Sequence, residues 1–211
     1  MNILFFLLFS TNVTYPLFEF GGKVGLNYNN IDKQKIIYNE TEKTDYSIDF
    51  NSGIIFNVHV NNWFYAGMEM LYNRRGFNLS DDLNGDMKVI LHYLEFPMIL
   101  GIKAENLSIY TGFYISALLN TQENCNSKCV KSETEPFGEN FDRSNSGFLF
   151  GLSYKINNIS FDMRYSKSVN ELYVYPDTYS GIDNFYQFMF SIVFSFDFNF
   201  HTDMRIPLII F

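Results

Sequence analysis

The sequence predicts an all-β fold, an eight-stranded antiparallel up-and-down β-barrel that crosses a membrane with its strands. Three observations support this prediction. Eight segments alternate between apolar and polar residues, which is typical of strands rather than helices. The connections between them alternate between short and long, as in barrels of the outer membrane. The apolar side chains are also too large and too many to fit inside so small a barrel.

The alternation is clearest in FYQFMFSIVFSFDFNF, residues 185–200. Successive side chains of a strand point to opposite faces, so one face of this segment carries mainly Phe and the other carries mainly Gln, Ser, Asp and Asn. Seven earlier segments show the same alternation. The eight predicted strands are residues 19–28, 47–60, 63–77, 87–103, 107–121, 145–156, 159–169 and 184–200.

The connections after the second, fourth and sixth strands are short. They contain the pairs Asn61–Asn62, Glu105–Asn106 and Asn157–Asn158, and Asn accepts the positive φ that two-residue hairpin turns require. The other connections are long and polar: 29–46, 78–86, 122–144 and 170–183. Outer-membrane barrels have short periplasmic turns and long extracellular loops. The sequence therefore predicts extracellular loops and periplasmic termini.

The two faces of the predicted strands differ in volume, which indicates the side that meets lipid. The interior of an eight-stranded barrel is just wide enough for side chains to fill it. The apolar face carries large residues such as Phe96, Phe113 and Phe150, whereas the opposite face carries Gly, Ser and charged residues. We therefore expect the apolar face outside, in lipid, where a closed barrel pairs every backbone polar group.

Charges of both signs fall on the predicted inner face. We expect them to pair in a packed core rather than to line a pore, although an ion or proton path is an alternative for the same residues. Pro97 interrupts this face of the fourth strand, and we expect a local bulge there because Pro removes a ladder hydrogen bond. The predicted charge network of the lumen consists of Glu69, Glu95, Lys103, Lys155, Asp162, Arg164 and Asp197.

The overall charge excludes one class of partner. The net charge is −8, and acidic residues outnumber basic ones in each of the four long connections. No basic stripe is present, so nucleic acid is not an expected partner. Beyond the first ten residues no apolar run is long enough for a membrane-spanning helix.

The ends of the chain and its two cysteines allow alternative interpretations. Residues 1–18 are predicted to be a signal peptide, because Ile3 to Phe9 form a short apolar segment; an apolar first strand is the alternative. Residues 201–211 form a tail to which no role is assigned. Cys125 and Cys129 are close enough in sequence to form a disulfide within a loop in an oxidising compartment; two free thiols are the alternative.

No motif predicts catalysis. None of the three histidines, His59, His92 and His201, stands beside a nucleophile motif. No enzymatic activity, cofactor or metal site is therefore expected.

A group of basic residues lies at the end of the third predicted strand and at the start of the fourth. Arg74, Arg75 and Lys88 are expected at the outer end of one hairpin. They are candidates for contact with lipopolysaccharide phosphates, which guanidinium groups bind bidentately. The alternative is pairing with the neighbouring Asp81, Asp82 and Asp86.

Several segments resemble one known family. GGKVGLNYNN (21–30) is similar to the family's first strand, YNRRGF (72–77) to the end of its third, and LHYLEFPMILGIK (91–103) to its fourth, including the proline. GFLFGLSYKI (147–156) and MRYSKSVNELY (163–173) are similar to its sixth and seventh strands. On these motifs residues 19–200 resemble the PorT-like outer-membrane β-barrel proteins of Bacteroidetes. The resemblance implies an eight-stranded barrel in the outer membrane, and for a few members a role in type IX secretion and gliding.

The function predicted from these observations is non-catalytic. We expect a structural or interaction barrel whose acidic loops meet partners outside the cell, with outer-membrane lipid and lipopolysaccharide around it. A PorT-like subunit of a secretion or gliding apparatus, with envelope proteins as partners, is the second interpretation. A small-solute channel and a lipid-modifying barrel enzyme are further alternatives.

Overall fold

The structure is a computed structural model that describes residues 18–31, 43–81, 85–125, 143–170, 173–174, 181–182 and 185–198. Residues 1–17 of the predicted signal peptide (1–18), the tail 201–211 and Cys129 lie outside these residues, so the predicted disulfide does too; Phe18 itself begins the first strand. Within the described part of the chain, no helix is long and apolar enough to cross a membrane.

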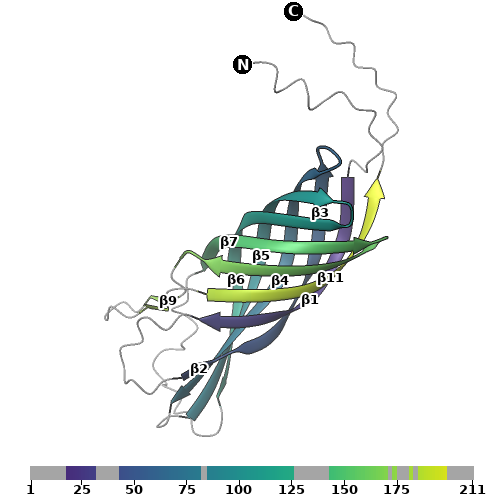
Figure 1. Cartoon of the computed structure of the whole chain (residues 1–211). Coiled ribbons are helices and arrows are strands. Elements are labelled where there is room, and N and C mark those ends of the chain that lie inside the picture. The colour runs from purple at the N-terminus through teal and green to yellow at the C-terminus, as the bar shows by residue number, and fades with distance from the viewer. Residues whose placement is uncertain are drawn as a thin grey trace, which may run out of the picture.

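Eight long strands form one closed antiparallel barrel, which confirms the predicted fold class (Figure 1). Each strand pairs with its neighbour in sequence, and β1 pairs with β11 from Phe18 opposite Phe198 to Ile31 opposite Phe185, which closes the ring. The strands are β1 (Phe18–Ile31), β3 (Ser47–His59), β4 (Phe64–Asp81), β5 (Gly85–Ala104), β6 (Leu107–Cys125), β7 (Ser144–Ile156), β8 (Ile159–Ser168) and β11 (Phe185–Phe198).

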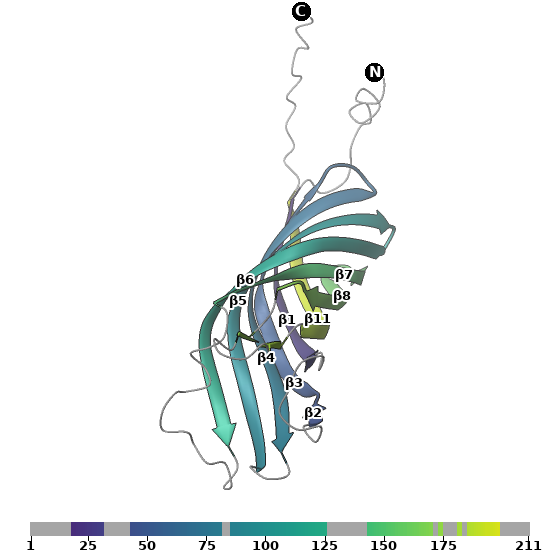
Figure 2. The same cartoon turned by 90° about the vertical axis from the view of Figure 1, so that its left-hand side faces the viewer.

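The predicted long connection at 78–86 is wrong. β4 continues to Asp81 and β5 begins at Gly85, and these two residues are still cross-strand partners. β6 likewise extends to Cys125, opposite Met87 of β5. The outer parts of β4, β5 and β6 therefore continue past the rest of the barrel as a protruding wall (Figure 2). Polar residues remain in strands here because hydrogen bonds to neighbouring strands override their turn preference.

Three short strands complete the sheet structure. β2 (Lys43–Asp45) pairs with β4 near the end of the protruding wall, and β9 (Tyr173–Val174) pairs with β10 (Gly181–Ile182). All three lie between long strands, at the end of the barrel that we call the loop end. The opposite end, which carries the connections 60–63, 105–106 and 157–158, is the turn end.

The turns at the turn end use two different devices. Glu105 and Asn157 both have φ of 54°, the positive value expected for two-residue hairpin turns. The connection at 60–63 is longer and works differently: the Asn61 Oδ1 atom accepts the backbone N–H groups of Trp63 and Phe64, at 3.0 and 2.7 Å. Asn61 thus stabilises the turn through its side chain and not through a positive φ.

Pro97 lies in β5 without a bulge, contrary to the prediction. Its pairing with β4 is interrupted, because the ladder runs from Met68 opposite Met98 directly to Leu71 opposite Glu95 with the same register on both sides. On its other side Pro97 stays paired with Tyr114 of β6. The ladder therefore tolerates the missing N–H group locally, and the register shift of β5 lies elsewhere, between His92 and Tyr93.

The apolar face of the strands is outside, as the volume argument predicted. Outward side chains such as Phe148 and Phe196 are 68% and 60% exposed. Inward side chains are mostly buried, and many of them are polar or charged. An exposed apolar belt around a buried polar interior is the arrangement expected of a barrel with lipid as its solvent.

Candidate functional site: the polar interior of the barrel

The centre of the barrel holds two cations and two carboxylates that pair with one another. The Arg164 guanidinium donates to both carboxylate oxygens of Glu69, at 2.6 and 2.9 Å. Lys23 Nζ lies 2.7 Å from Asp162 Oδ1 and 3.5 Å from Glu69 Oε1. The Tyr110 hydroxyl donates to Asp162 Oδ2 at 2.6 Å and accepts from Arg164 Nε at 3.1 Å. These five residues, the central cluster, balance charge in a buried site.

A second group, the turn-end cluster, joins β1, β3, β7 and β11. Lys155 Nζ lies 2.7 Å from Glu19 Oε1 and 2.8 Å from Asp197 Oδ1. Glu19 also accepts from Ser195 Oγ at 2.6 Å and from Asn57 Nδ2 at 2.8 Å. The pairing of one ammonium with two carboxylates joins β7 to β1 and β11, although β8 lies between β7 and β11 in the sheet.

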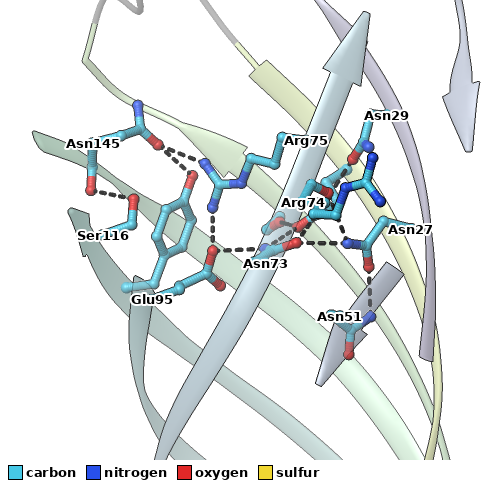
Figure 3. A network of polar contacts seen from close by, with 12 residues as sticks. Asn27, Asn29, Asn51, Asn73, Arg74, Arg75, Glu95, Ser116 and Asn145 are labelled. Carbon is cyan, nitrogen blue, oxygen red and sulfur yellow. Dashed lines mark hydrogen bonds and ion pairs between the residues drawn. The ribbon is translucent and has the colours of Figure 1, made fainter. Parts of the chain in front are cut away.

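The third group, the loop-end cluster, is built around Arg75 (Figure 3). Arg75 is fully buried, donates to the Glu95 carboxylate and to Asn145 Oδ1, and has its guanidinium carbon 4.8 and 5.0 Å from the ring centroids of Tyr93 and Tyr114. The aromatic rings attract the guanidinium cation, and the carboxylate fixes its orientation. Because the planar guanidinium is already rigid, it loses little conformational freedom when it forms these hydrogen bonds. This contact fills the lumen beneath the protruding wall.

Amide side chains connect the loop-end cluster to the opposite wall. Asn73 Nδ2 donates to Glu95 Oε2 at 2.9 Å, and Asn27 Nδ2 donates to Asn73 Oδ1 at 2.6 Å (Figure 3). Asn51 Nδ2 in turn donates to Asn27 Oδ1 at 2.6 Å, and Gln187 Nε2 donates to Asn29 Oδ1 at 2.9 Å. Amides supply both donors and acceptors, so such a chain crosses a barrel without leaving a charge unpaired.

Side chains also close a break between β3 and β4. Their ladder ends at Asn51 opposite Asn73, and β2 resumes pairing only at Asp45 opposite Asn78. In between, Asp49 Oδ2 accepts the Gly76 N–H at 2.7 Å, and Asn27 donates to the Arg74 carbonyl at 3.1 Å. Inward polar groups thus replace the missing strand pairing, as buried backbone groups require.

The structure brings together six of the seven residues predicted for the lumen charge network, in three separate clusters. Glu69, Asp162 and Arg164 are central, Glu95 is in the loop-end cluster, and Lys155 and Asp197 are in the turn-end cluster. The seventh, Lys103, lines a cavity of about 50 Å³ near the turn end and makes no ion pair with any residue that the structure describes.

One predicted surface contact is wrong. Arg75 cannot meet lipopolysaccharide, because it lies on the inward face of β4 and its side chain is 0% exposed. Its ion-pair partner among the described residues is Glu95. Arg74 points the other way: its side chain is 26% exposed, lies 5.1 Å above the outward Phe50 ring and stays 3.9 Å from Asp49 Oδ1. Lys88, the third residue predicted to contact lipopolysaccharide, is half-buried and lies opposite Asn78 of β4.

The predicted charge network of the lumen does not include several interior residues. Lys23 and Glu19 share the inward face of β1, and Tyr110 shares that of β6, so extending the period-two pattern to every polar residue would have found them. Arg75 was missed because the pair Arg74–Arg75 was treated as one basic patch. Neighbours in a strand point to opposite faces, so the two cannot share an environment.

The histidines within the described residues sit beside polar partners. His59 Nε2 lies 3.6 Å from Glu19 Oε2, and His92 Nδ1 lies 2.5 Å from the Tyr72 hydroxyl. His201 lies outside the described part of the chain. Among the residues that the structure describes, no three His, Cys, Asp or Glu side chains gather as metal ligands would.

Comparison with known proteins identifies the class of barrel. The sequence pattern of the family described as outer membrane protein beta-barrel domain matches residues 16–174. No curated protein sequence matches this chain significantly. The family pattern covers outer-membrane barrels in general, so the narrower resemblance to PorT-like proteins stays a prediction.

Solved structures of similar shape include several outer-membrane proteins. The outer membrane protein AlkL, solved in DMPC lipid bilayers, is 13% identical with a TM-score of 0.51, over 92% of this chain and 97% of that one. OprG from Pseudomonas aeruginosa is 12% identical with a TM-score of 0.47, over 87% and 98% of the two chains. Ail of Yersinia pestis is 12% identical with a TM-score of 0.45, over 85% and 99%. At such identity the likeness to AlkL shows the fold alone.

Proposed function

Because the chain belongs to the family of outer membrane protein β-barrel domains, we propose that it is a non-catalytic barrel of the bacterial outer membrane that is closed to solutes and carries an interaction surface at its loop end. The family places the protein in that membrane. The closed interior and the interaction surface go beyond what membership of the family implies.

The observation that carries the proposal is the packing of the lumen. The central cluster crosses the barrel from β1 through β4 to β8, and the loop-end cluster crosses it again from β4 and β5 to β7. All the charged members of these two clusters are at most 5% exposed. A conducting pore needs a continuous hydrated path, whereas buried and mutually paired charges form a rigid core.

The loop end offers the larger surface for partners. The protruding wall of β4, β5 and β6 extends beyond the lipid-facing belt, and the connections at this end are acidic in sequence. In the proposed orientation, with this end outside the cell and the termini in the periplasm, the wall presents strands to envelope proteins of other cells or to external ligands. Arg74 and Lys88, on its outer face, are suited to lipopolysaccharide phosphates.

Two measurements on the same sample test the proposal. The protein extracted from outer membranes is run on an SDS gel with and without boiling, and it is reconstituted in planar bilayers for single-channel recording. We expect a shift of the gel band on boiling, because a closed ladder has no free edge, together with no stable conductance. A shifting band with reproducible conductance steps would make the protein a small-solute channel instead, and a band without a shift would overturn the membrane barrel.

A further inference from the structure

The cavity near the turn end contains charged groups that already have partners and one that does not. Glu69 and Asp162, which line it, pair with Arg164 and Lys23, and Glu19 pairs with Lys155, which it shares with Asp197. Lys103 lines the same cavity and is half-buried, yet no carboxylate of the described chain lies within ion-pair distance of it. Lys103 is therefore the one charged side chain lining the cavity that has no ion-pair partner among the described residues.

Two serines follow Lys103 across the neighbouring strands. Ser108 of β6 is the cross-strand partner of Lys103, and Ser153 of β7 is the cross-strand partner of Ser108, so the three side chains follow one another along the wall. All three line the cavity. Neither hydroxyl makes a side-chain hydrogen bond with the described residues, so both are available as donors.

A buried histidine lines the same cavity. His59 of β3 lines the cavity and is 6% exposed, and its Nε2 atom has no hydrogen-bond partner. The nearest carboxylate oxygen, Glu19 Oε2, is 3.6 Å away, too far for a hydrogen bond. A buried polar atom without a protein partner is rare in folded proteins, so this ring nitrogen is available to a group that enters the cavity.

We propose that this cavity is a carboxylate-binding site, in which Lys103 pairs with the carboxylate and Ser108, Ser153 and His59 contribute hydrogen bonds. A single carboxylate group would meet the one unpaired cation and occupy unused donors, leaving the paired charges of the central and turn-end clusters in place. Because the turn end faces the periplasm in the proposed orientation, the carboxylate belongs either to a small free acid or to an acidic side chain of a periplasmic protein.

Acetate is the probe that tests the site. The full barrel, folded in detergent micelles, is labelled with ¹³C-methyl groups on its lysines and titrated with sodium acetate, with sodium chloride at equal ionic strength as the reference. We expect a saturable shift of the Lys103 signal with acetate alone, and no such shift for the exposed Lys167. In Lys103→Gln, the acetate dependence of the His59 ring signals should weaken roughly ten-fold, as for loss of a charge-assisted hydrogen bond.

Three results would overturn the proposal: shifts that chloride reproduces, a Lys103 signal that does not saturate, or a His59 response that Lys103→Gln leaves unchanged. Lys167→Gln is the matched control, since it removes the same charge from the outer surface. Retention of the heat-dependent gel shift shows that each variant has folded. This readout is independent of conductance, so the site and the closed lumen can fail separately.

A second experiment identifies the source of the carboxylate once acetate binds. A photo-crosslinking residue replaces Ala104, which is exposed at the turn end next to Lys103, and cells are irradiated. A crosslinked protein that disappears in Lys103→Gln identifies a protein-borne carboxylate. Acetate binding without a crosslinked product identifies a small free acid.

Discussion

Arg164 shows how much one interior residue holds in place. It joins β8 to β4 through Glu69 and also donates to Tyr110 of β6, with all three side chains buried. Removal of one member of a buried ion pair leaves the other as an uncompensated charge, which costs more than the pair itself contributes. The stability of the central cluster therefore depends on its being complete.

For Arg164→Gln we predict a loss of about 3–5 kcal/mol in the free energy of unfolding, because Glu69 keeps only Lys23 at 3.5 Å. Urea unfolding of the barrel in lipid vesicles measures this loss. Lys167→Gln, on the outer face of the same strand, is the control and should change the unfolding free energy by less than about 1 kcal/mol. Equal losses in the two variants would contradict a special role of the central cluster.

The Arg75–Glu95 pair allows a double-mutant test at the loop end. Arg75→Met alone should destabilise the barrel by about 3–5 kcal/mol, since Glu95 is then buried without a cation. Adding Glu95→Leu should restore most of that loss, because an apolar pair suits the aromatic surroundings of Tyr93, Tyr114 and Phe185. The same urea experiment measures both variants. If the double variant were no more stable than Arg75→Met, the charge left on Glu95 would not explain the loss.

At the scale of elements, inward tyrosines pack across glycines of the neighbouring strand. Tyr65 of β4 is opposite Gly101 of β5, and Tyr110 of β6 is opposite Gly151 of β7. A Cβ atom at either glycine would collide with the ring of its partner tyrosine. Glycine is needed at these two positions because the ring lies flat over the adjacent backbone and from there reaches into the lumen.

Gly151→Val should therefore displace the Tyr110 ring and break its hydrogen bonds to Asp162 and Arg164. We expect a destabilisation of about 1–3 kcal/mol, the usual cost of overpacking, measured by urea unfolding in vesicles. Gly22→Val is the matched control: it is also a glycine within a strand, but its Cβ would meet only the Gly53 carbonyl at 4.0 Å, so the substitution should be close to neutral. A larger loss for Gly22→Val would contradict the packing argument.

At the scale of the whole molecule, the barrel is the reverse of a soluble protein. Its largest exposed surface is apolar, and its buried interior is rich in charge and amide groups. Lipid supplies the apolar surroundings of the belt, and the closed sheet satisfies the backbone. The fold is thus stable only where its outer face meets lipid or detergent.

Because the outer face needs lipid around it, the destabilisation caused by an arginine on that face should depend on its depth in the bilayer. Phe150→Arg, near the middle of β7 with a side chain 55% exposed, should destabilise the barrel in vesicles by about 2–4 kcal/mol. Ile156→Arg, at the turn end of the same strand, should cost about 0–1 kcal/mol because an interfacial arginine reaches water. Urea unfolding of both variants in the same lipid tests the order. A larger cost at Ile156 would place the membrane elsewhere on the barrel.

The fold class and the positions of the strands follow from the amino-acid sequence alone. Period-two alternation is a local property, so the eight strands, the side facing lipid and most of the interior charges could be predicted from nearby residues alone. The short turns could be placed as well, although Glu105 and Asn157 take the positive φ while Asn61 acts through its side chain.

Only the tertiary structure decided how far the strands run and which charges meet. The extension of β4 and β5 through residues predicted as loop depends on hydrogen bonds to neighbouring strands, and the register without a bulge at Pro97 depends on the ladders on both sides. The partnership of Lys23 with Asp162 joins residues far apart in sequence. Pairings of this kind follow from the stagger of the closed barrel, a property of all eight strands together that no single segment carries.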